Sequence, residues 1–362
     1  MTIFLSFTIN NSSMTDYYLT LSEKLADQFQ VVVITDRIEP HPFQIDERII
    51  ILKWPSARPT HWRDFKFIVS LIKKFRPSVM ISMFGSVNLF LISGLLMRVK
   101  HRLVWYHTIS SASDSTPMLY FRKKIIYRLA TGFITNSRAT FYDIQQAFKV
   151  PEKKIKIAYN AVRQGIPLPM NQPRELVYVG RLHQSKGINV LLDAMPAVLE
   201  VFPDVVLHLY GGYLNGNAIK QYQRQVGELQ IGANVTFFGN RPKEEIMEAF
   251  AKAYVSILPS YFEAFGYVVI ESFSVGTPVV GSDTSGIAEI IRDGIDGMLF
   301  EPGNSAQLSQ KIIHLLSEPA LRDKYATNCL GRFASEFEIG SVTSKIAKFI
   351  GSLDGENDPQ SL

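Results

Sequence analysis

The chain of 362 residues has a single cysteine, Cys329, so an internal disulfide is impossible. This composition suits a reducing compartment, with Cys329 as an inert core residue. Long hydrophobic runs are also missing: the longest, near Leu89 to Met97, has about half of the roughly 20 residues that a membrane-spanning helix needs. The N-terminus has no basic segment, which favours a first strand over a signal peptide. We expect a cytoplasmic protein, with a peripheral location at the inner face of a membrane as the second reading.

Motifs of two common enzyme classes are absent as well. No G-x-G-x-x-G follows a predicted strand, which argues against a dinucleotide-dependent oxidoreductase. No D-x-D occurs, and the His and Cys residues do not have the spacing of a metal site, so we expect neither a metal nor a cofactor.

Charge is distributed unevenly between the two halves. Residues 1–165 carry 23 Lys and Arg against 11 Asp and Glu, a net charge of +12, whereas residues 166–362 carry 15 against 22, a net charge of −7. The first half therefore favours an anionic partner. Two of its segments, 61–76 and 119–129, mix Lys and Arg with aromatics at helical spacing, as in basic helices that bind an anionic membrane surface. The alternative is that their apolar stripes face the core. No nucleic-acid-binding module accompanies the charge, so we expect no nucleic-acid partner.

Short β-branched or apolar runs alternate with helical patterns, which predicts a doubly wound α/β fold. Segment 162–174, VRQGIPLPMNQPR, has three prolines and a glycine and indicates a linker. It separates a predicted N-terminal domain (1–165, completed by a helix over 336–352) from a C-terminal domain (173–335), and a disordered tail (353–362) follows. Strands are expected at 3–7, 31–35, 49–52, 79–84, 103–107, 132–137, 175–180, 205–211, 234–239, 255–260 and 278–282, and helices at 17–28, 62–75 and 190–201, among others.

The segment YFEAFGYVVIE, residues 261–271, follows a predicted buried strand and opens a predicted helix that ends at Gly276. Gly266 lies at the helix start, where a backbone without Cβ lets a ligand approach the exposed N–H groups. Acids on both sides of such an anion site suit a phosphate ligand that carries hydroxyls, such as a nucleotide sugar, with Glu263 on the sugar and Glu271 on the ribose. Alternatively, Glu263 is a solvated loop residue and Glu271 only favours the helix dipole.

The segment VGRLHQSKG, residues 179–187, places Arg181 and Lys186 around another strand-to-helix loop. Two cations near a helix start oppose the helix dipole, unless an anion lies between them. Their hydrogen bonds to a diphosphate would neutralise a leaving nucleoside diphosphate without a metal. A solvated basic loop is the alternative for this segment by itself.

Five segments resemble, in order, the donor half of the family 4 retaining glycosyltransferases, enzymes of the GT-B fold. They are VYVGRLHQSKGINVLLDAM, LHLYGG, VTFFGNRPKEEIMEAF, LPSYFEAFGYVVIESFSVGTPVVGSDTSGIAEII and DGIDGMLFEPGN, within residues 175–335. In the first half, LVWYHTIS, ITNS and VPEKKIKIAYNAV are similar to segments of the same family. The resemblance implies two facing Rossmann-like domains with an interdomain cleft.

The resemblance also implies roles for individual residues. Arg181 and Lys186 match the basic pair that holds the donor diphosphate, and Glu263 and Glu271 match the glutamates near the donor sugar and on the ribose. On that view Glu263 positions the sugar and is not a covalent nucleophile. The further matches are the amides of Phe265, Gly266 and Tyr267 under the diphosphate, Gly212 beside the nucleoside, Asn240 and Arg241 around the base, and His107, which reaches the transferred sugar.

One loop departs from the family pattern. Members usually have a Gly-Gly pair after the first strand, whereas this loop reads INNSSMTDYY, without glycine. The side chains of Asn10, Asn11, Ser12 and Ser13 are candidates for the acceptor-binding role that the backbone has elsewhere.

The expected function is a retaining, metal-independent glycosyltransferase. It would move a hexosyl unit from a nucleotide-diphosphate sugar, UDP-sugar before GDP-mannose, to a glycan or lipid-linked acceptor in polysaccharide or glycolipid synthesis, forming an α-linkage. The alternatives are a GT-B nucleotide-sugar epimerase and a non-catalytic homologue that binds a nucleotide sugar.

Overall fold

The structure, a computed structural model, describes residues 1–57, 60–110, 116–168, 174–212 and 216–353. The chain forms two compact units: the first unit comprises Met1–Ala161 with Ile339–Leu362, and the second comprises Val162–Glu338. Except for Leu353, the predicted disordered tail lies outside the described residues, as do positions 169–173 of the predicted linker. None of the helices in the described part of the chain is long and apolar enough to cross a bilayer.

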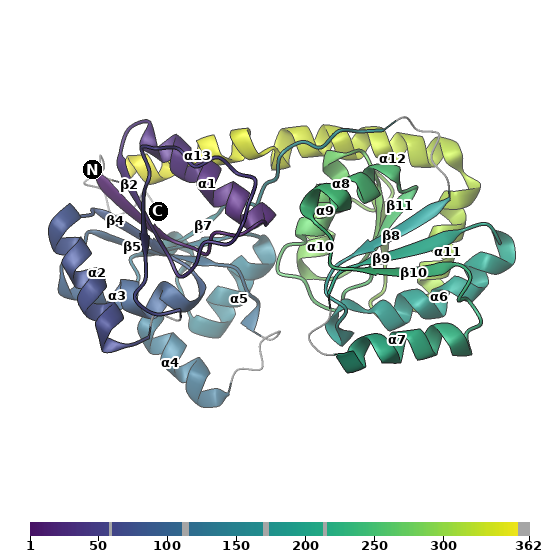
Figure 1. Cartoon of the computed structure of the whole chain (residues 1–362), viewed down its shortest axis with the longest axis horizontal. Helices are drawn as coiled ribbons and strands as arrows, with labels where there is room; N and C mark the ends of the chain where they lie inside the picture. The colour runs from purple at the N-terminus through teal and green to yellow at the C-terminus, as the bar shows by residue number, and fades with distance from the viewer. Residues whose placement is uncertain (58–59, 111–115, 169–173, 213–215, 354–362) are drawn as a thin grey trace. The chain divides into compact units, whose positions relative to one another are not determined.

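The first unit is built on a seven-stranded parallel sheet with the order β3-β2-β1-β4-β5-β6-β7 (Figure 1). The order reverses between β1 and β4, which makes the carboxyl ends of these strands the place where such folds bind ligands. The strands are β1 (Thr2–Ser6), β2 (Gln30–Thr35), β3 (Ile50–Lys53), β4 (Val79–Ser82), β5 (His101–Tyr106), β6 (Gly132–Thr135) and β7 (Ile155–Ile157). The α-helices are α1 (Ser13–Ala26), α2 (Trp62–Phe75), α3 (Val87–Leu96), α4 (Pro117–Tyr127), α5 (Arg138–Phe148) and α13 (Ile339–Ser352), with 3₁₀ turns η1 (Phe84–Ser86) and η3 (Glu152–Lys154).

The second unit has a six-stranded parallel sheet with the order β10-β9-β8-β11-β12-β13. Here the order reverses between β8 and β11. The strands are β8 (Glu175–Val179), β9 (Val206–Tyr210), β10 (Val235–Gly239), β11 (Val255–Leu258), β12 (Val279–Ser282) and β13 (Gly297–Phe300). The helices are α6 (Ile188–Val201), α7 (Gly216–Glu228), α8 (Lys243–Lys252), α9 (Tyr267–Ser274), α10 (Ser285–Ile290), α11 (Ser305–Ser317) and α12 (Pro319–Arg332), with the 3₁₀ turn η4 (Gln184–Lys186) and the π-helical turn η5 (Phe333–Phe337).

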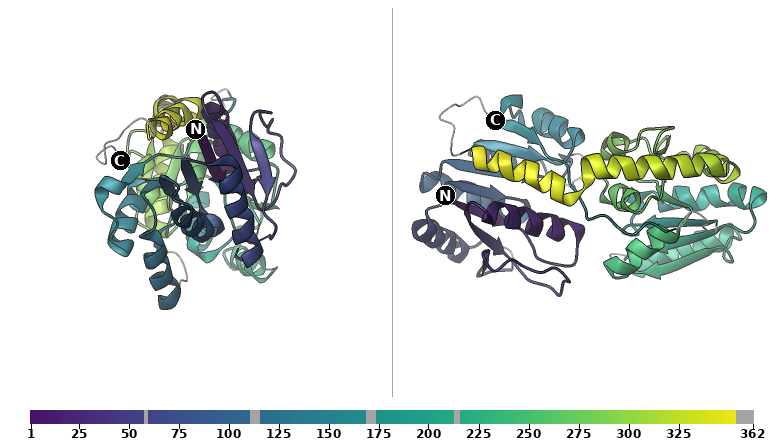
Figure 2. Two further views of the ribbon diagram at one scale, coloured as in Figure 1. Left: turned by 90° about the vertical axis from the view of Figure 1, so that its left-hand side faces the viewer. Right: turned by 90° about the horizontal axis from the view of Figure 1, so that it is seen from above.

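The last helix of the described chain returns to the first unit. Ile339, Val342, Ile346 and Ile350 of α13 are buried in one hydrophobic cluster with Leu21, on α1. Figure 2 shows α13, in yellow, running beside α1, in purple. The first unit is therefore discontinuous in sequence, because its core needs both ends of the described chain.

The strands predicted from apolar runs are confirmed, within one or two residues at their ends. Central parallel strands are buried on both faces and so appear in sequence as continuous apolar runs. The short outer strands β7 and β13 were not predicted, because three or four residues at a sheet edge carry too little pattern. The predicted helix after Gly266 is confirmed as α9, with Gly266 as its N-cap residue.

Candidate functional site

In the second unit, the two predicted binding segments lie at the point where the strand order reverses. Arg181 and Lys186 follow β8, and Glu263 and Gly266 follow β11, the strand paired directly with β8. Because both strands are parallel, their carboxyl ends meet at the same edge of the sheet. The two motifs, about 80 residues apart in sequence, are thus brought together by the sheet.

Lys186 and Glu263 form the direct contact between these segments. Lys186 Nζ donates to Glu263 Oε1 in an ion pair whose side chains are only 16% and 20% exposed. Ser260 Oγ lies 3.4 Å from the same carboxylate oxygen. The pair holds a cation and an anion side by side, on segments that follow β8 and β11.

The backbone ties the same two segments together. The N–H of Tyr261 donates to Ser185 O at 2.9 Å. Gly187, with φ of +64°, lies so close to β11 that a Cβ there would be 2.0 Å from Pro259 O. Only glycine permits both this conformation and this approach.

Helix α9 begins with its N-terminus at this edge. Gly266 adopts φ of +103°, and the first N–H groups of the helix have no partner within the helix itself. Phe265 is buried, and a Cβ on Gly286 would be 2.6 Å from its backbone, so α10 supports this loop closely. Such a helix start attracts anions.

Tyr267 and Glu271 lie one turn apart on α9. Burial, and then the charge of Glu271, raises the pKa of the Tyr267 phenol well above its ordinary value. Within the described part of the chain, the buried hydroxyl of Tyr267 has no hydrogen-bond partner. The phenol therefore stays protonated, with a hydroxyl hydrogen that the described residues leave unused.

Arg181 is exposed, and Tyr178 Oη donates to its carbonyl at 3.0 Å. Burial raises the pKa of Tyr178, the charge of Glu263 raises it further, and the charge of Arg181 opposes the shift. Both charged groups therefore act on the same phenol.

The turn after β9 meets the loop after β10. A Cβ on Gly212 would be 2.6 Å from Asn240 Oδ1, so these two predicted residues are in contact. Arg241 points back to its own loop, with Nε donating to Phe238 O at 3.1 Å and NH1 3.8 Å from Glu245. The structure thus brings Gly212 and Asn240 together and engages Arg241 locally.

In the first unit, His107 follows β5 and is buried, with 8% of its surface exposed. Its Nε2 lies 2.5 Å from Tyr18 Oη, and its Nδ1 lies 3.4 Å from Asn136 Nδ2. Because an amide NH2 only donates, Nδ1 accepts and the ring proton is on Nε2. Burial lowers the pKa of His107 to about 3, so the ring is neutral at physiological pH.

The four polar residues of the first loop have different surroundings. Ser12 caps α1 by accepting from the N–H of Thr15 at 3.2 Å, and its hydroxyl donates to Asn10 Oδ1 at 2.6 Å. Asn10 also accepts from the hydroxyl of Thr15 at 2.8 Å. Asn11 is exposed and Ser13 is buried. Asn10 and Ser12 therefore shape the start of α1.

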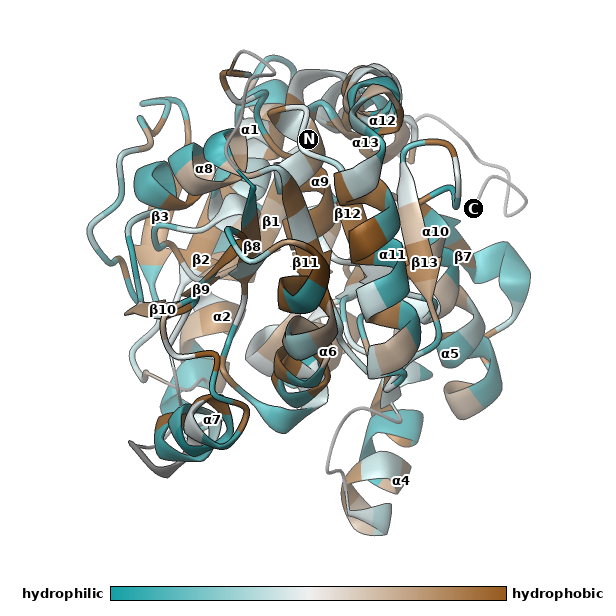
Figure 3. Cartoon of the chain, turned by 90° about the vertical axis from the view of Figure 1, so that its right-hand side faces the viewer, coloured by the Kyte–Doolittle hydropathy of each residue, from teal (hydrophilic) through white to brown (hydrophobic). Residues whose placement is uncertain are grey.

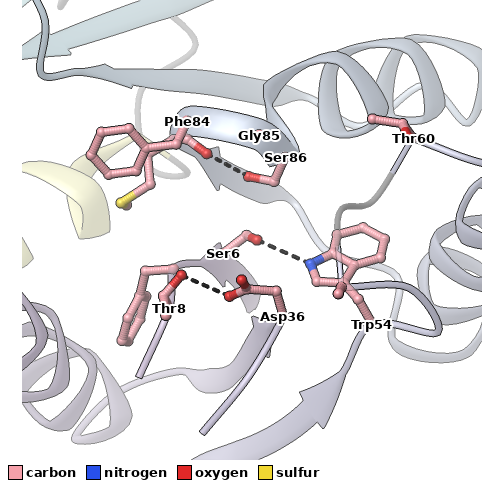
Figure 4. Close-up of a pocket in the computed structure, with 11 residues that line it drawn as sticks. Ser6, Thr8, Asp36, Trp54, Thr60, Phe84, Gly85 and Ser86 are labelled. Atoms are coloured by element: carbon pink, nitrogen blue, oxygen red, sulfur yellow. Dashed lines mark hydrogen bonds between the residues drawn. The ribbon is translucent and has the colours of Figure 1, made fainter. Parts of the chain in front are cut away.

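A pocket of about 300 Å³ opens beside this loop, at the carboxyl ends of β1 to β4 (Figure 4). Thr8 Oγ1 donates to Asp36 Oδ1 at 2.7 Å, and Trp54 Nε1 lies 3.4 Å from Ser6 Oγ. Phe84 forms a wall with the unusual φ of +50° for a side chain of this size. Its ring stacks on His107, with centroids 5.3 Å apart. The pocket therefore has a carboxylate and aromatic walls, and Phe84 connects it to His107, which lies behind that ring.

Our sequence reasoning missed Asp36, Trp54 and Phe84. Each directly follows a strand or lies one residue beyond it, so a search of every strand end would have found them. The positive φ of Phe84 has no sequence signal.

Comparison with solved structures identifies the fold. Sucrose-phosphate synthase from Thermosynechococcus elongatus superposes with a TM-score of 0.82 at 21% identity, covering 98% of this chain and 99% of that one. Anabaena Alr3699/HepE in complex with UDP-glucose gives a TM-score of 0.78 at 18% identity, covering 97% and 100%. The fold is that of the GT-B glycosyltransferases, two Rossmann-like domains with parallel sheets.

Sequence comparison identifies the family. Residues 14–164 match the model of Glycosyltransferase Family 4, and residues 164–330 match that of Glycosyl transferases group 1. The chain belongs to the family 4 glycosyltransferases. The phosphatidyl-myo-inositol mannosyltransferase of Mycobacterium leprae is 35% identical over 154 residues, which are 42% of this chain and 40% of that protein. The chain spans about half the length of the curated relatives it matches.

Proposed function

We propose that the protein is a retaining glycosyltransferase. It moves a hexosyl unit from a nucleotide-diphosphate sugar to a glycan or lipid-linked acceptor, forming an α-linkage, in polysaccharide or glycolipid synthesis. The observation that carries the proposal is the ion pair of Lys186 with Glu263 beside the N-terminus of α9, where the strand order of the second unit reverses. These groups supply cations and N–H donors for a diphosphate and a carboxylate for sugar hydroxyls.

In this proposal, Lys186 exchanges Glu263 for the donor diphosphate. Arg181 and the first N–H groups of α9 share its charge, so the leaving nucleoside diphosphate is stabilised by groups that are already in place. Glu263, freed from the lysine, accepts hydrogen bonds from the sugar, and Glu271 accepts them from the ribose. No step requires a metal ion.

A UDP-sugar is the preferred donor, and GDP-mannose is the second. The likeness to Anabaena Alr3699/HepE in complex with UDP-glucose supports the first, and the partial likeness to a mannosyltransferase supports the second. The pocket of Asp36, Trp54 and Phe84 is the proposed place for acceptor hydroxyls, because a carboxylate beside aromatic rings is a common combination for binding a sugar.

Calorimetric titration with UDP and with GDP, both in EDTA, tests the donor site. We expect one nucleotide to bind, and Lys186→Ala to bind it about 10- to 100-fold more weakly, because a charge-assisted hydrogen bond contributes about 1.5–3 kcal/mol. Lys252→Ala, at an exposed lysine at the end of α8, is the matched control and should bind normally. If neither nucleotide binds, or if both variants bind like the parent, the donor site is wrong.

Turnover separates the alternative functions. Release of free nucleotide only when an acceptor is present indicates transfer, whereas conversion of the sugar without an acceptor indicates an epimerase. Nucleotide binding without turnover over a range of acceptors indicates a non-catalytic homologue. The anomeric configuration of the product, measured by NMR, tests retention.

A further inference from the structure

The two basic segments of the first unit, which look alike in sequence, differ in what their apolar residues contact. In α2, Ile68, Leu71 and Ile72 are buried in the core beside the sheet. Helix α4, in contrast, buries no residue completely, and three of its large apolar side chains are exposed: Met118 at 82%, Phe121 at 64% and Ile125 at 46%. Figure 3 shows α4 as a mixture of hydrophobic and hydrophilic segments.

The exposed residues of α4 form one stripe. Positions 118, 121 and 125 are spaced by three and four residues, so they lie along the same face of the helix. The opposite face packs inward through Tyr120 and Tyr127, which contact the cluster around Phe133 and Phe148. The outer stripe is therefore not the core-facing side of the helix.

A basic pocket of about 280 Å³ adjoins this stripe. It lies between α4, the end of α5 and η3, and its cationic lining consists of Lys124, Arg128, Lys149 and Lys154. Lys124 and Arg128 are three residues after Phe121 and Ile125, respectively, so they are on the flank of the apolar stripe. None of the residues that line the pocket is acidic. Within the described ranges of the chain, none of these four cations forms an ion pair with a carboxylate.

Four unneutralised cations around one pocket repel each other, and an anion in the pocket relieves that cost. Lys149 is held there by the backbone, since it caps α5 in a left-handed conformation with φ of +56°. The pocket is larger than a phosphate group and has aromatic walls from Tyr127 and Phe148. A phosphate with an attached organic group therefore fits its chemistry better than a bare inorganic ion.

We propose that this face binds an anionic phospholipid bilayer, with a lipid phosphate in the pocket of Lys124, Arg128, Lys149 and Lys154 and with Met118, Phe121 and Ile125 among the acyl chains. The apolar stripe and the phosphate pocket are side by side, as the acyl region and the headgroups of a bilayer are. The proposal deepens the membrane contact expected of an enzyme with a lipid-linked acceptor, and it does not depend on the transfer chemistry.

Co-sedimentation of the full chain with vesicles tests the proposal. We expect binding to phosphatidylcholine vesicles that contain phosphatidylglycerol, and little binding to phosphatidylcholine by itself. The double variant Lys124→Gln/Arg128→Gln should bind the anionic vesicles about 30-fold more weakly, since each cation near such a surface contributes about 1 kcal/mol. Phe121→Ser/Ile125→Ser should lose the binding that persists at high salt.

The matched control is Lys73→Gln/Lys74→Gln, which removes the same charge from exposed positions at the end of α2. We expect it to retain most of the binding. If it loses as much binding as the pocket variant, vesicle binding depends only on the net charge of the protein, and the proposal is wrong. It is also wrong if the Phe121/Ile125 variant binds like the parent, or if inorganic phosphate binds the pocket in calorimetry while vesicles do not bind.

All three variants should bind the nucleotide like the parent, because they are in the first unit and the proposed donor site is in the second. A failure of vesicle binding with intact nucleotide binding therefore overturns the membrane proposal and leaves the proposed function standing. Loss of nucleotide binding with intact vesicle binding overturns the donor site and leaves the membrane proposal standing.

Discussion

Lys186 and Glu263 are 77 positions apart, and their ion pair carries the proposed donor site. Burying such a pair costs solvation free energy, and the pair is a better indication of a binding site than of stability. In the proposed function, Lys186 of this pair, the N-terminus of α9 and the exposed Arg181 are the three groups that contact the diphosphate. Loss of either partner leaves a largely buried charge without a counter-charge, which costs free energy.

His107 makes the stability of the first unit depend on pH. Its pKa is about 3 in the folded protein and 6.5 in its ordinary state, so below pH 6.5 the unfolded chain binds a proton that the folded chain does not. Stability therefore falls as the pH is lowered from about 6.5 towards 3, by about 1.4 kcal/mol for each pH unit. Between pH 7 and pH 5 we expect a loss of about 2 kcal/mol from this residue.

Urea unfolding monitored by tryptophan fluorescence measures this loss. All three tryptophans, Trp54, Trp62 and Trp105, are in the first unit, so the signal reports on that unit. His107→Gln removes the titrating group and should flatten the dependence between pH 7 and pH 5. An equally steep dependence in the variant would assign the effect to other residues.

At the scale of elements, Gly187 connects η4 and α6 to the end of β11. We expect Gly187→Ala to lower the stability of the protein by more than the about 1–2 kcal/mol that a left-handed conformation costs, because its Cβ also clashes with Pro259 O. Displacement of η4 carries Lys186 away from Glu263, so nucleotide binding should be lost as well. Thermal unfolding by circular dichroism and calorimetric titration measure the two effects.

Gly331→Ala is the matched control for that substitution. Gly331 is in α12, and a Cβ there meets no atom within 4 Å. Alanine in a helix is about 0.5–1 kcal/mol more stable than glycine, so this variant should unfold at the same or a higher temperature and should bind nucleotide normally. Equal losses in both variants would contradict the special role of Gly187.

Helices α2 and α4 show where sequence patterns reach their limit. Both have basic and aromatic residues at helical spacing, and either could have been the surface helix. The structure covers the stripe of α2 with the core and exposes that of α4. Periodicity predicts that a helix has an apolar face, but the neighbouring elements determine whether that face is covered.

At the scale of the whole molecule, the first unit depends on the far end of the described chain. Removal of residues 339–362 takes Ile339, Val342, Ile346, Ile350 and Leu353 out of its core. Burial of such side chains contributes about 1.5–3 kcal/mol each, a total comparable to the whole stability of a domain. We expect the tryptophan fluorescence of this shortened protein to be that of an unfolded unit.

A chain that ends at residue 353 is the control for this truncation. It keeps the five buried side chains and should show the tryptophan transition of the full chain. The prediction is contradicted if the protein that ends at Glu338 unfolds with an unchanged tryptophan transition.

Much of the fold could be predicted from local patterns, because buried parallel strands are continuous apolar runs and helices alternate with them. The motifs around Lys186 and Glu263 were recognisable because their residue types and their places after strands suit a phosphate ligand. Asp36 could have been predicted in the same way, since it directly follows a predicted strand, but it was overlooked. Phe84 was overlooked at the end of another predicted strand, and its positive φ has no signal in its residue type.

Local sequence thus specified most of the elements and the charged motifs, since these depend on residues close together in the chain. Tertiary structure decided the contacts between distant residues. The order of the sheet placed β8 beside β11 and so paired Lys186 with Glu263, and burial made His107 neutral. Packing against the core covered the apolar stripe of α2 and left that of α4 exposed, because burial depends on which elements meet in space.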